Sequence, residues 1–170
     1  LGDIVFVDDD GKELLIVERK SLSDLVASIK DGRYDEQSYR LIHSSGLYRH
    51  HIMYLIEGGM SQVLNPTEKK MIYSSMLTLQ LYKGFSIMKT TSMIETAEWI
   101  IYSANKLSSM VKKGHELWSP ESAIIEQVPS NYCSVVKKTK KDNVTPENIG
   151  EIILCQIPGI SSVSAITIMK

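Results

Sequence analysis

The chain has 170 residues, of which 43% are hydrophobic and 23% are charged, as in an ordinary globular protein. Its formal net charge of −1 provides no bulk attraction to nucleic acid. No segment approaches the roughly 18 apolar residues that span a membrane. Two cysteines without metal-type spacing argue against a disulfide framework and favour a reducing compartment. We therefore expect an intracellular protein without membrane association.

The ends and the charge distribution add to this picture. The chain begins at Leu1 rather than Met and stops at Lys170 within an apolar periodic segment, so we interpret it as a fragment of a longer protein. Residues 1–60 are acidic on balance, and residues 61–170 are mildly basic. The basic part includes a lysine cluster that fits a solvated loop or a phosphate contact equally well: Lys137, Lys138, Lys140 and Lys141.

The first predicted element is a β-hairpin. Two apolar runs, residues 4–7 and 14–17, flank Asp10-Gly11, which is a strong hairpin signal. Both faces of both strands are apolar, so we expect them in the middle of a covered sheet. With a two-residue turn, facing residues have numbers that sum to 21, which pairs Val7 with Leu14, Val5 with Ile16 and Asp3 with Glu18.

Helices and strands alternate through residue 113, which predicts an α/β domain over residues 1–113. Helices are expected over residues 21–31, 35–45, 65–82 and 92–113, and further strands over 52–56 and 85–90. The last helix has its apolar residues along one face: Ile94, Ala97, Ile101, Ala104 and Leu107.

The remainder of the chain is expected to be a linker and a helical pair. Residues 114–144 contain two prolines and the lysine cluster, and we predict a linker there, with room for one short helix. Residues 145–156 form a predicted helix, and a second begins at Ser161. The tight connection Ile157-Pro158-Gly159-Ile160 lies between them.

Charged residues at the end of the second strand indicate chemistry. Carboxylates facing each other in an antiparallel pair have Cβ atoms about 4.5–5.5 Å apart and repel unless a cation lies between them. Asp3 and Glu18, with water, suit Mg²⁺ or Mn²⁺. Lys20 points to the same face as Glu18 because strand side chains alternate. This arrangement fits metal-assisted phosphodiester hydrolysis, although a carboxylate and a lysine two apart are also common on exposed strand edges.

The motifs resemble those of the XPF/Mus-eighty-one structure-specific endonucleases. The resemblance rests on Gly2-Asp3, on Glu18-Arg19-Lys20-x-x-x-Asp24, on the continuation through Asp31-Gly32-Arg33 and Glu36-Gln37, and on the hairpin around Pro158-Gly159. It is strongest to the Mus-eighty-one-type catalytic subunit. It implies a restriction-endonuclease-like domain with a central mixed sheet flanked by helices. The tail, residues 145–170, would then be the start of a helix-hairpin-helix module.

The same resemblance implies a role for each residue of the motif. Asp3 and Glu18 would hold the metal, with the backbone carbonyl of Arg19 as a further ligand. Lys20 would position or activate the attacking water. Asp24 would orient Lys20 or Arg19, and it also fits a capping box with the preceding serine. The implied cofactor is Mg²⁺, for which Mn²⁺ can substitute.

Further residues are candidates for DNA contact. Arg33 and Arg40 would lie near the substrate strand, or else form surface ion pairs with Asp35 or Glu36. In the tail, three residues would meet the DNA backbone: Pro158, which fixes the turn, Gly159, which allows close approach, and Ser161, where amides open a helix. A plain turn between packed helices is the alternative for this segment.

The implied function is cleavage of branched DNA, such as 3′ flaps, forks and nicked junctions, in DNA repair and recombination. The implied partner is an inactive relative in a heterodimer, with a homodimer as the alternative, and the implied location is the nucleus in a eukaryotic cell. Two other functions stay open: a non-catalytic DNA-binding or scaffold subunit, and a junction resolvase of different fold. The sequence also departs from the family pattern: we expect that the strand before Gly2-Asp3 is absent or lies in a missing segment, and that residues 145–170 hold only the start of a module with two hairpins.

Overall fold

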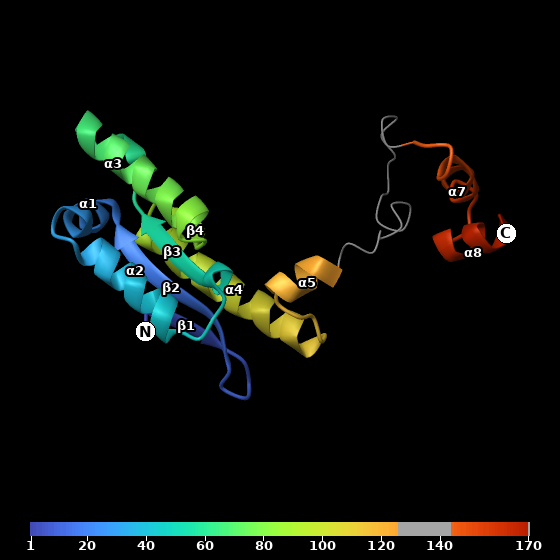
Figure 1. Ribbon diagram of the computed structural model, residues 1–170, viewed down its shortest axis with the longest axis horizontal. Helices are drawn as coiled ribbons and strands as arrows, with labels where there is room; N and C mark the ends of the chain where they lie inside the picture. The colour runs from blue at the N-terminus through green and yellow to red at the C-terminus, as the bar shows by residue number, and fades with distance from the viewer. Residues whose placement is uncertain (126–143, 170) are drawn as a thin grey trace. The chain divides into compact units, whose positions relative to one another are not determined.

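The computed structural model describes residues 1–125 and 144–169 (Figure 1). The chain divides into two compact units, Leu1–Leu117 and Trp118–Lys170. The lysine cluster predicted for the linker lies outside the described residues. Among the residues that are described, no helix is long and apolar enough to cross a membrane.

The first unit is built on a four-stranded mixed sheet. Its strands are β1 (Ile4–Val7), β2 (Glu13–Ser21), β3 (Ile52–Glu57) and β4 (Ser86–Thr90). They are ordered β1-β2-β3-β4, with β1 antiparallel to β2 and the other neighbours parallel. The predicted mixed sheet is therefore confirmed, and it places the end of β2 beside the end of β3.

The predicted β1–β2 hairpin is present, but its two-residue turn is wrong. The Asp8 amide donates to the Lys12 carbonyl at 3.0 Å, which leaves a three-residue loop that ends in Gly11 at φ +80°. A turn followed by a left-handed glycine is a common three-residue hairpin geometry. A bulge between Phe6 and Val7 then compensates for the longer loop.

The bulge restores the predicted pairing nearer the strand ends. Val7 faces Glu13 rather than the predicted Leu14. From Phe6 back to Ile4 the paired residue numbers again sum to 21, and Val5 faces Ile16 as predicted. Asp3 therefore lies beside the end of β2 as predicted, although the turn between the strands is longer than predicted.

The prediction that both hairpin strands lie in the middle of the sheet is wrong for β1. This strand is at the edge, and the side chains of Val5 and Val7 are 37% and 54% exposed. Phe6 points to the other face and is buried against Trp99, with ring centroids 6.2 Å apart. The apolar run of β1 thus covers only one layer of the domain.

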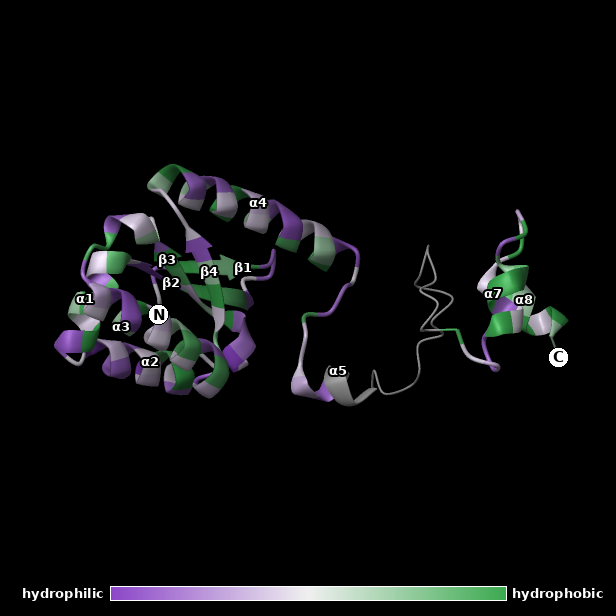
Figure 2. Cartoon of the chain, turned by 90° about the horizontal axis from the view of Figure 1, so that it is seen from above, coloured by the Kyte–Doolittle hydropathy of each residue, from purple (hydrophilic) through white to green (hydrophobic). Residues whose placement is uncertain are grey.

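Helices cover both faces of the sheet (Figure 2). On one face lie α1 (Leu22–Lys30), α2 (Arg33–Ser44) and α3 (Pro66–Leu77), and α3 continues as a π-helical turn, Thr78–Tyr82. Short 3₁₀ turns span Arg49–His51 and Met60–Gln62. The other face is covered by α4 (Met93–Lys112). The larger core lies on the α1–α3 side, centred on Ile16, Leu25, Tyr54 and Phe85.

Most of the apolar face predicted for α4 does not pack against the sheet. Ile94 and Ile101 are 74% and 60% exposed. The helix contacts the sheet through Leu107 of the predicted face and through Trp99 and Ile100, which pack around buried Val17 and Leu55. The isoleucine pattern has helical spacing, but the large indole of Trp99 fills the space over the sheet.

The second unit contains short helices. In the described part of the segment predicted as a linker, one short helix is present, α5 (Pro120–Ile125). Two others, α7 (Ile149–Leu154) and α8 (Ser162–Ile168), form a pair joined through Ile157-Pro158-Gly159-Ile160. Ser161 caps α8 by accepting a hydrogen bond from the amide of Ser164. Buried Glu151 accepts from the Ser162 hydroxyl at 2.6 Å, which links the two helices.

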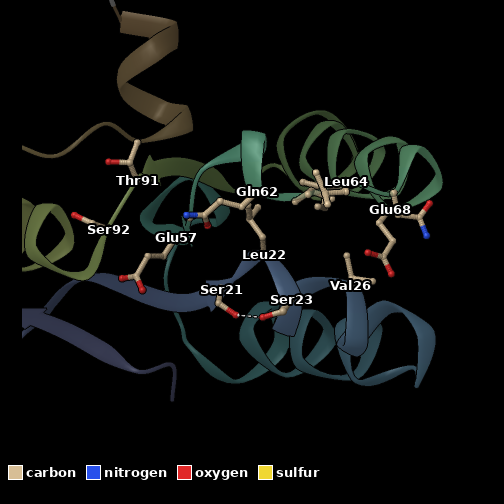
Figure 3. Close-up of a pocket in the computed structure, with 14 residues that line it drawn as sticks. Ser21, Leu22, Ser23, Val26, Glu57, Gln62, Leu64, Glu68, Thr91 and Ser92 are labelled. Carbon is tan, nitrogen blue, oxygen red and sulfur yellow. Dashed lines mark hydrogen bonds between the residues drawn. The ribbon is translucent and has the colours of Figure 1, made fainter.

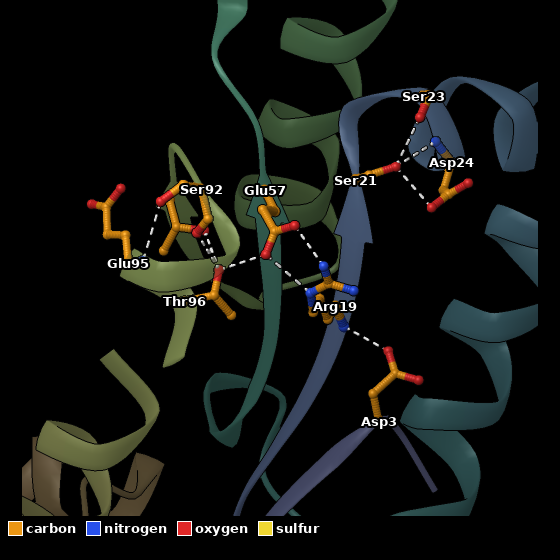
Figure 4. Close-up of polar contacts among 10 residues, drawn as sticks. Asp3, Arg19, Ser21, Ser23, Asp24, Glu57, Ser92, Glu95 and Thr96 are labelled. Atoms are coloured by element: carbon orange, nitrogen blue, oxygen red, sulfur yellow. Dashed lines mark hydrogen bonds and ion pairs between the residues drawn. The ribbon is translucent and has the colours of Figure 1, made fainter. Parts of the chain in front are cut away.

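A polar network ties β2, β3 and α4 together (Figure 4). The Arg19 guanidinium donates to both carboxylate oxygens of Glu57, at 3.1 Å from Nε. The Thr96 hydroxyl donates to the same carboxylate at 2.7 Å. The Arg19 hydrogen bonds, and then the Thr96 hydroxyl, hold the pKa of Glu57 below its ordinary value. The network therefore stabilises the fold only while Glu57 is ionised.

We predict that Glu57→Gln lowers the free energy of unfolding by about 1 kcal/mol at neutral pH, a modest value because Arg19 is partly exposed and screened by water. A depressed carboxyl pKa contributes stability above the ordinary glutamate value, about 4.3, and loses it as pH falls through the folded-state pKa. Denaturant titrations should show the difference shrinking in acid. Exposed Glu98→Gln is the control, and a pH-independent difference for Glu57→Gln would contradict the assignment.

Candidate active site

The end of β2 carries a buried ion pair. Glu18 and Lys20 point to the α1–α3 face and are only 8% and 6% exposed, with Lys20 Nζ 3.1 Å from Glu18 Oε1. Glu18 lies opposite Tyr54, whose pKa is raised to about 12, mainly by burial, with a smaller contribution from the Glu18 charge. Charges this deeply buried are costly unless they are paired.

Asp3 reaches the open edge of β2 from the residue before β1. Its amide donates to the Val17 carbonyl at 2.9 Å, and its carboxylate accepts from the Arg19 amide at 2.8 Å (Figure 4). The side chain of Asp3 thus takes the place of a strand partner where β1 has ended. This position brings the carboxylate next to the backbone of Glu18-Arg19-Lys20.

Gly2 makes this approach possible. Its φ is +73°, and an added Cβ would lie 2.6 Å from Ile16 Cγ2 and 3.0 Å from the Val17 carbonyl oxygen. Both the left-handed backbone and the contact with β2 therefore require glycine. The Gly-Asp dipeptide is a unit in which the first residue permits the close approach and the second delivers the carboxylate.

Arg19 contributes to the site through its backbone. Its side chain leaves on the opposite face of the sheet to pair with Glu57, so the guanidinium points away from Glu18. Its amide points to the β1 side, toward Asp3. The amide and carbonyl of one strand residue point to the same side, so the Arg19 carbonyl also faces this edge. The geometry is compatible with the predicted ligand role of that carbonyl.

A pocket of about 260 Å³ joins these groups to α2. Its lining is Leu1, Gly2, Asp3, Glu18, Gln37, Arg40 and Leu41. The side-chain oxygen Gln37 Oε1 is buried and lacks a hydrogen-bond partner. No group of three or more Asp, Glu, His or Cys side chains suited to a metal occurs in the described part of the chain. Two carboxylates and neutral oxygens fit Mg²⁺ or Mn²⁺, which keep several waters as ligands.

Asp24 hydrogen-bonds to the helix-capping Ser21 rather than to the residues that it is predicted to orient. Its carboxylate accepts from the Ser21 hydroxyl at 2.7 Å, and its amide donates back to that hydroxyl at 3.0 Å. Within the described ranges no hydrogen bond joins it to Lys20 or Arg19. The helix-capping interpretation describes these contacts, and the orienting role of Asp24 stays a prediction.

The two predicted DNA-contacting arginines form surface ion pairs. Arg33 pairs with Asp31 at 2.8 Å rather than with Asp35 or Glu36, and this contact raises the pKa of Arg33 and lowers that of Asp31. Arg40 pairs with Glu36 at 2.9 Å, as the surface alternative predicted. Both arginines are more than half exposed. Of the two, only Arg40 lines the 260 Å³ pocket that contains Asp3 and Glu18, here called the acidic pocket.

A larger pocket of about 620 Å³ lies elsewhere, at the carboxyl ends of β2 and β3 (Figure 3). Helices α1, α3 and α4 begin around it, and one amide in the first turn of each bonds to a capping side chain, that of Ser21, Asn65 or Ser92. We assign the chemistry to the smaller pocket, which holds the two carboxylates.

Two residues of this region were not assigned a role from the sequence. Glu57 closes β3, and its pairing with Arg19 depends on the parallel register of β2 and β3. Gln37 lies one helical turn before Leu41, so both face the pocket from α2. The sequence signal for Glu57 is a charged residue directly after an apolar strand. The signal for Gln37 is a polar residue one helical turn from a buried leucine.

We predict that Gly2→Ala weakens Mn²⁺ binding by at least about tenfold, because displacing Asp3 breaks up the carboxylate pair, and lowers stability by about 1–3 kcal/mol. Titration followed by electron paramagnetic resonance, with thermal melting, measures both effects. Gly11→Ala is the matched control: its φ is +80°, but a Cβ there meets nothing within 4 Å. Equal effects of the two substitutions on Mn²⁺ affinity would refute the close-approach argument.

Comparison with known proteins agrees with this geometry. The ERCC4 domain matches residues 1–102. The crossover junction endonuclease MUS81 of Gibberella zeae is 30% identical over 137 residues, 78% of this chain and 22% of its own length. The structure-specific endonuclease subunit MUS81 of Rattus norvegicus is 34% identical over 128 residues, 71% of this chain and 22% of its own length. The chain thus spans about a fifth of these relatives.

A solved structure shares the fold. XPF from Aeropyrum pernix aligns with a TM-score of 0.51 and 26% sequence identity, covering 99% of this chain and 66% of the other. The mixed sheet with flanking helices is therefore the XPF nuclease-domain fold. Together with the ERCC4 match, this confirms the resemblance noted in Glu18-Arg19-Lys20, and the chain belongs to the ERCC4-domain family of XPF/MUS81 nucleases.

Proposed function

We propose that the protein is a metal-dependent, structure-selective endonuclease that hydrolyses phosphodiesters near DNA branch points in repair and recombination. The observation that carries this proposal is a pocket lined by both Asp3 and Glu18, with Lys20 paired to Glu18 in a buried position. The names of its relatives, crossover junction endonuclease and structure-specific endonuclease subunit, support the substrate class. Those relatives are eukaryotic, which supports a nuclear location.

The residues of the pocket have distinct roles in this mechanism. Asp3, Glu18 and the Arg19 carbonyl would hold Mg²⁺ or Mn²⁺, which when bound polarises a phosphate oxygen and makes water more acidic. Lys20 is held beside Glu18, where its ammonium can orient the attacking water or offset the charge that develops on the phosphate. The Arg19 side chain lies on the opposite face of the sheet, where it anchors β2 to Glu57 on β3.

The alternatives have less support. A non-catalytic subunit has no need to bury a glutamate and a lysine beside an aspartate, yet this chain keeps all three. Proteins evolving without catalysis are free to replace such costly buried charges by apolar residues. A junction resolvase of different fold is excluded by the ERCC4 match and by the fold.

We propose that two sets of exposed residues contact DNA: arginines on α2 and the turn between α7 and α8. Arg40 lies at the pocket, and Arg33 is two turns earlier on nearly the same face of α2. Both side chains are exposed and can exchange a surface carboxylate for a phosphate. In the second unit, Pro158 and Gly159 are exposed in the turn, which the Ile160 amide closes onto the Ile157 carbonyl at 3.1 Å. We propose that this turn and Ser161 meet the DNA backbone, which is read without regard to sequence.

The second unit supports the proposal of a dimer. Its apolar residues are incompletely covered, with Ile153, Val163 and Ile166 at 59%, 75% and 37% exposed. One hairpin of two short helices cannot bury such residues by itself. We propose that a second hairpin and a partner chain cover them, with an inactive relative as the expected partner and a second copy of this chain as the alternative.

We predict that Glu18→Gln and Lys20→Met each abolish cleavage of flaps and forks in Mg²⁺ while DNA affinity changes by less than about threefold, since backbone contacts carry that affinity. Each single variant strands a buried charge and should lose about 3–5 kcal/mol of stability. The double variant Glu18→Gln/Lys20→Met should regain most of that stability and stay inactive. Cleavage by the folded double variant would exclude the proposed mechanism.

We predict that Gly159→Val weakens binding to a flap, a fork and a flap of unrelated sequence alike, by about tenfold or roughly 1.4 kcal/mol. Gly159 has φ +89° with no atom within 4 Å of a built Cβ, so valine distorts the turn and fills the space that we assign to DNA. Gly114→Val, at φ +71° and equally open, is the control. Unchanged DNA affinity in a folded Gly159→Val protein would show that this turn does not touch DNA.

A further inference from the structure

Gln37 presents an unused acceptor to the acidic pocket. Its Oε1 is the buried side-chain oxygen or nitrogen that lacks a partner across residues 1–125 and 144–169. An amide oxygen out of contact with water and without a donor costs free energy, so a native protein keeps one only for a reason. Gln37 shares the pocket with Asp3 and Glu18, and Leu41, 3% exposed, closes the same face of α2 one turn later.

Within the described residues, no donor of the protein reaches Gln37 Oε1. The Lys20 ammonium pairs with Glu18 at 3.1 Å. The Arg40 guanidinium pairs through Nε with Glu36 at 2.9 Å. The two carboxylates of the pocket accept hydrogen bonds and, when ionised, have none to donate. The hydrogen that satisfies Gln37 therefore comes from something that enters the pocket.

We propose that Gln37 is a positioning residue of the site: its amide oxygen accepts a hydrogen bond from a water molecule carried by the divalent cation that Asp3 and Glu18 hold. The inference rests on the proposed function and adds a residue to it. Water on a cation is a stronger donor than bulk water, because the metal draws charge from the oxygen. Gln37 would fix the orientation of that water and hold it in place, in the way that outer residues orient the ligands of other metal sites.

Two substitutions at Gln37 separate this role from a packing role. Gln37→Met keeps length and volume and removes the acceptor, whereas Gln37→Glu keeps the shape and adds a third carboxylate to the pocket. The measurements are Mn²⁺ affinity by electron paramagnetic resonance, the melting temperature without metal, and flap cleavage, all on the full-length protein. Exposed Gln80→Met on the π-helical turn is the matched control, and Glu18→Gln serves as the variant with a lost ligand.

We expect Gln37→Met to melt no lower than the wild type without metal, because it loses an orphaned polar atom, and to bind Mn²⁺ about tenfold more weakly. Gln37→Glu should melt lower without metal and bind Mn²⁺ at least as tightly as the wild type. Gln80→Met should change neither quantity.

The outcomes also distinguish failure of the inference from failure of the proposed function. Wild-type Mn²⁺ affinity in Gln37→Met would overturn the inference, and so would a lower melting temperature without metal, since that marks a packing role. Absence of Mn²⁺ binding by the wild type, or Mn²⁺ binding by Glu18→Gln equal to that of the wild type, would overturn the proposed function itself.

Discussion

The buried pair of Glu18 and Lys20 is the constraint on which the rest of the first unit depends. Two opposite charges, each less than a tenth exposed, lie on one face of a central strand, where their removal from water is costly. The strand must therefore be held so that the pair stays intact and still borders an opening. The clamp of Arg19 on Glu57 holds β2 from the opposite face, and Gly2 lets Asp3 hold it from the edge.

The side chains of the Glu18-Arg19-Lys20 motif thus have different roles on the two faces of β2. Glu18 and Lys20 face the helices α1–α3, and Glu18 also lines the pocket. The Arg19 side chain faces α4 and joins β2 to β3. Strand alternation alone produces this division, because neighbouring side chains point to opposite faces. The Glu-Arg-Lys order consequently places a structural cation between the two members of the buried ion pair, of which Glu18 borders the pocket.

The features that the sequence predicted correctly were those specified by local patterns. Alternating apolar runs, caps such as Ser21, Asn65 and Ser92, and the Asp10-Gly11 signal located strands, helices and a hairpin to within a few residues. The predicted register at the strand ends was also correct, but only because the bulge cancels the extra loop residue. The meeting of Asp3 with the end of β2 depends on that cancellation, which no local pattern announces.

The remaining features depend on packing between distant segments. Nothing in the spacing of α4 reveals that Trp99 rather than Ile101 faces the sheet, because both lie on apolar stripes of the helix. The Arg19–Glu57 contact requires the parallel register of two strands 38 positions apart in the chain. Gln37 reads as an ordinary polar helix residue until α2 is placed over the carboxylates.

The bulge at Phe6-Val7 allows the length of the hairpin loop to vary among related proteins without disturbing Asp3. It lies between the loop Asp8–Lys12 and the pairs closest to Asp3, so it isolates those pairs from the loop. Lengthening a surface loop costs little free energy, since the entropy of closure grows only slowly with length. Insertions at this tip can therefore accumulate among relatives, and a fluorophore or affinity tag can be placed there, at the far end of the hairpin from Asp3.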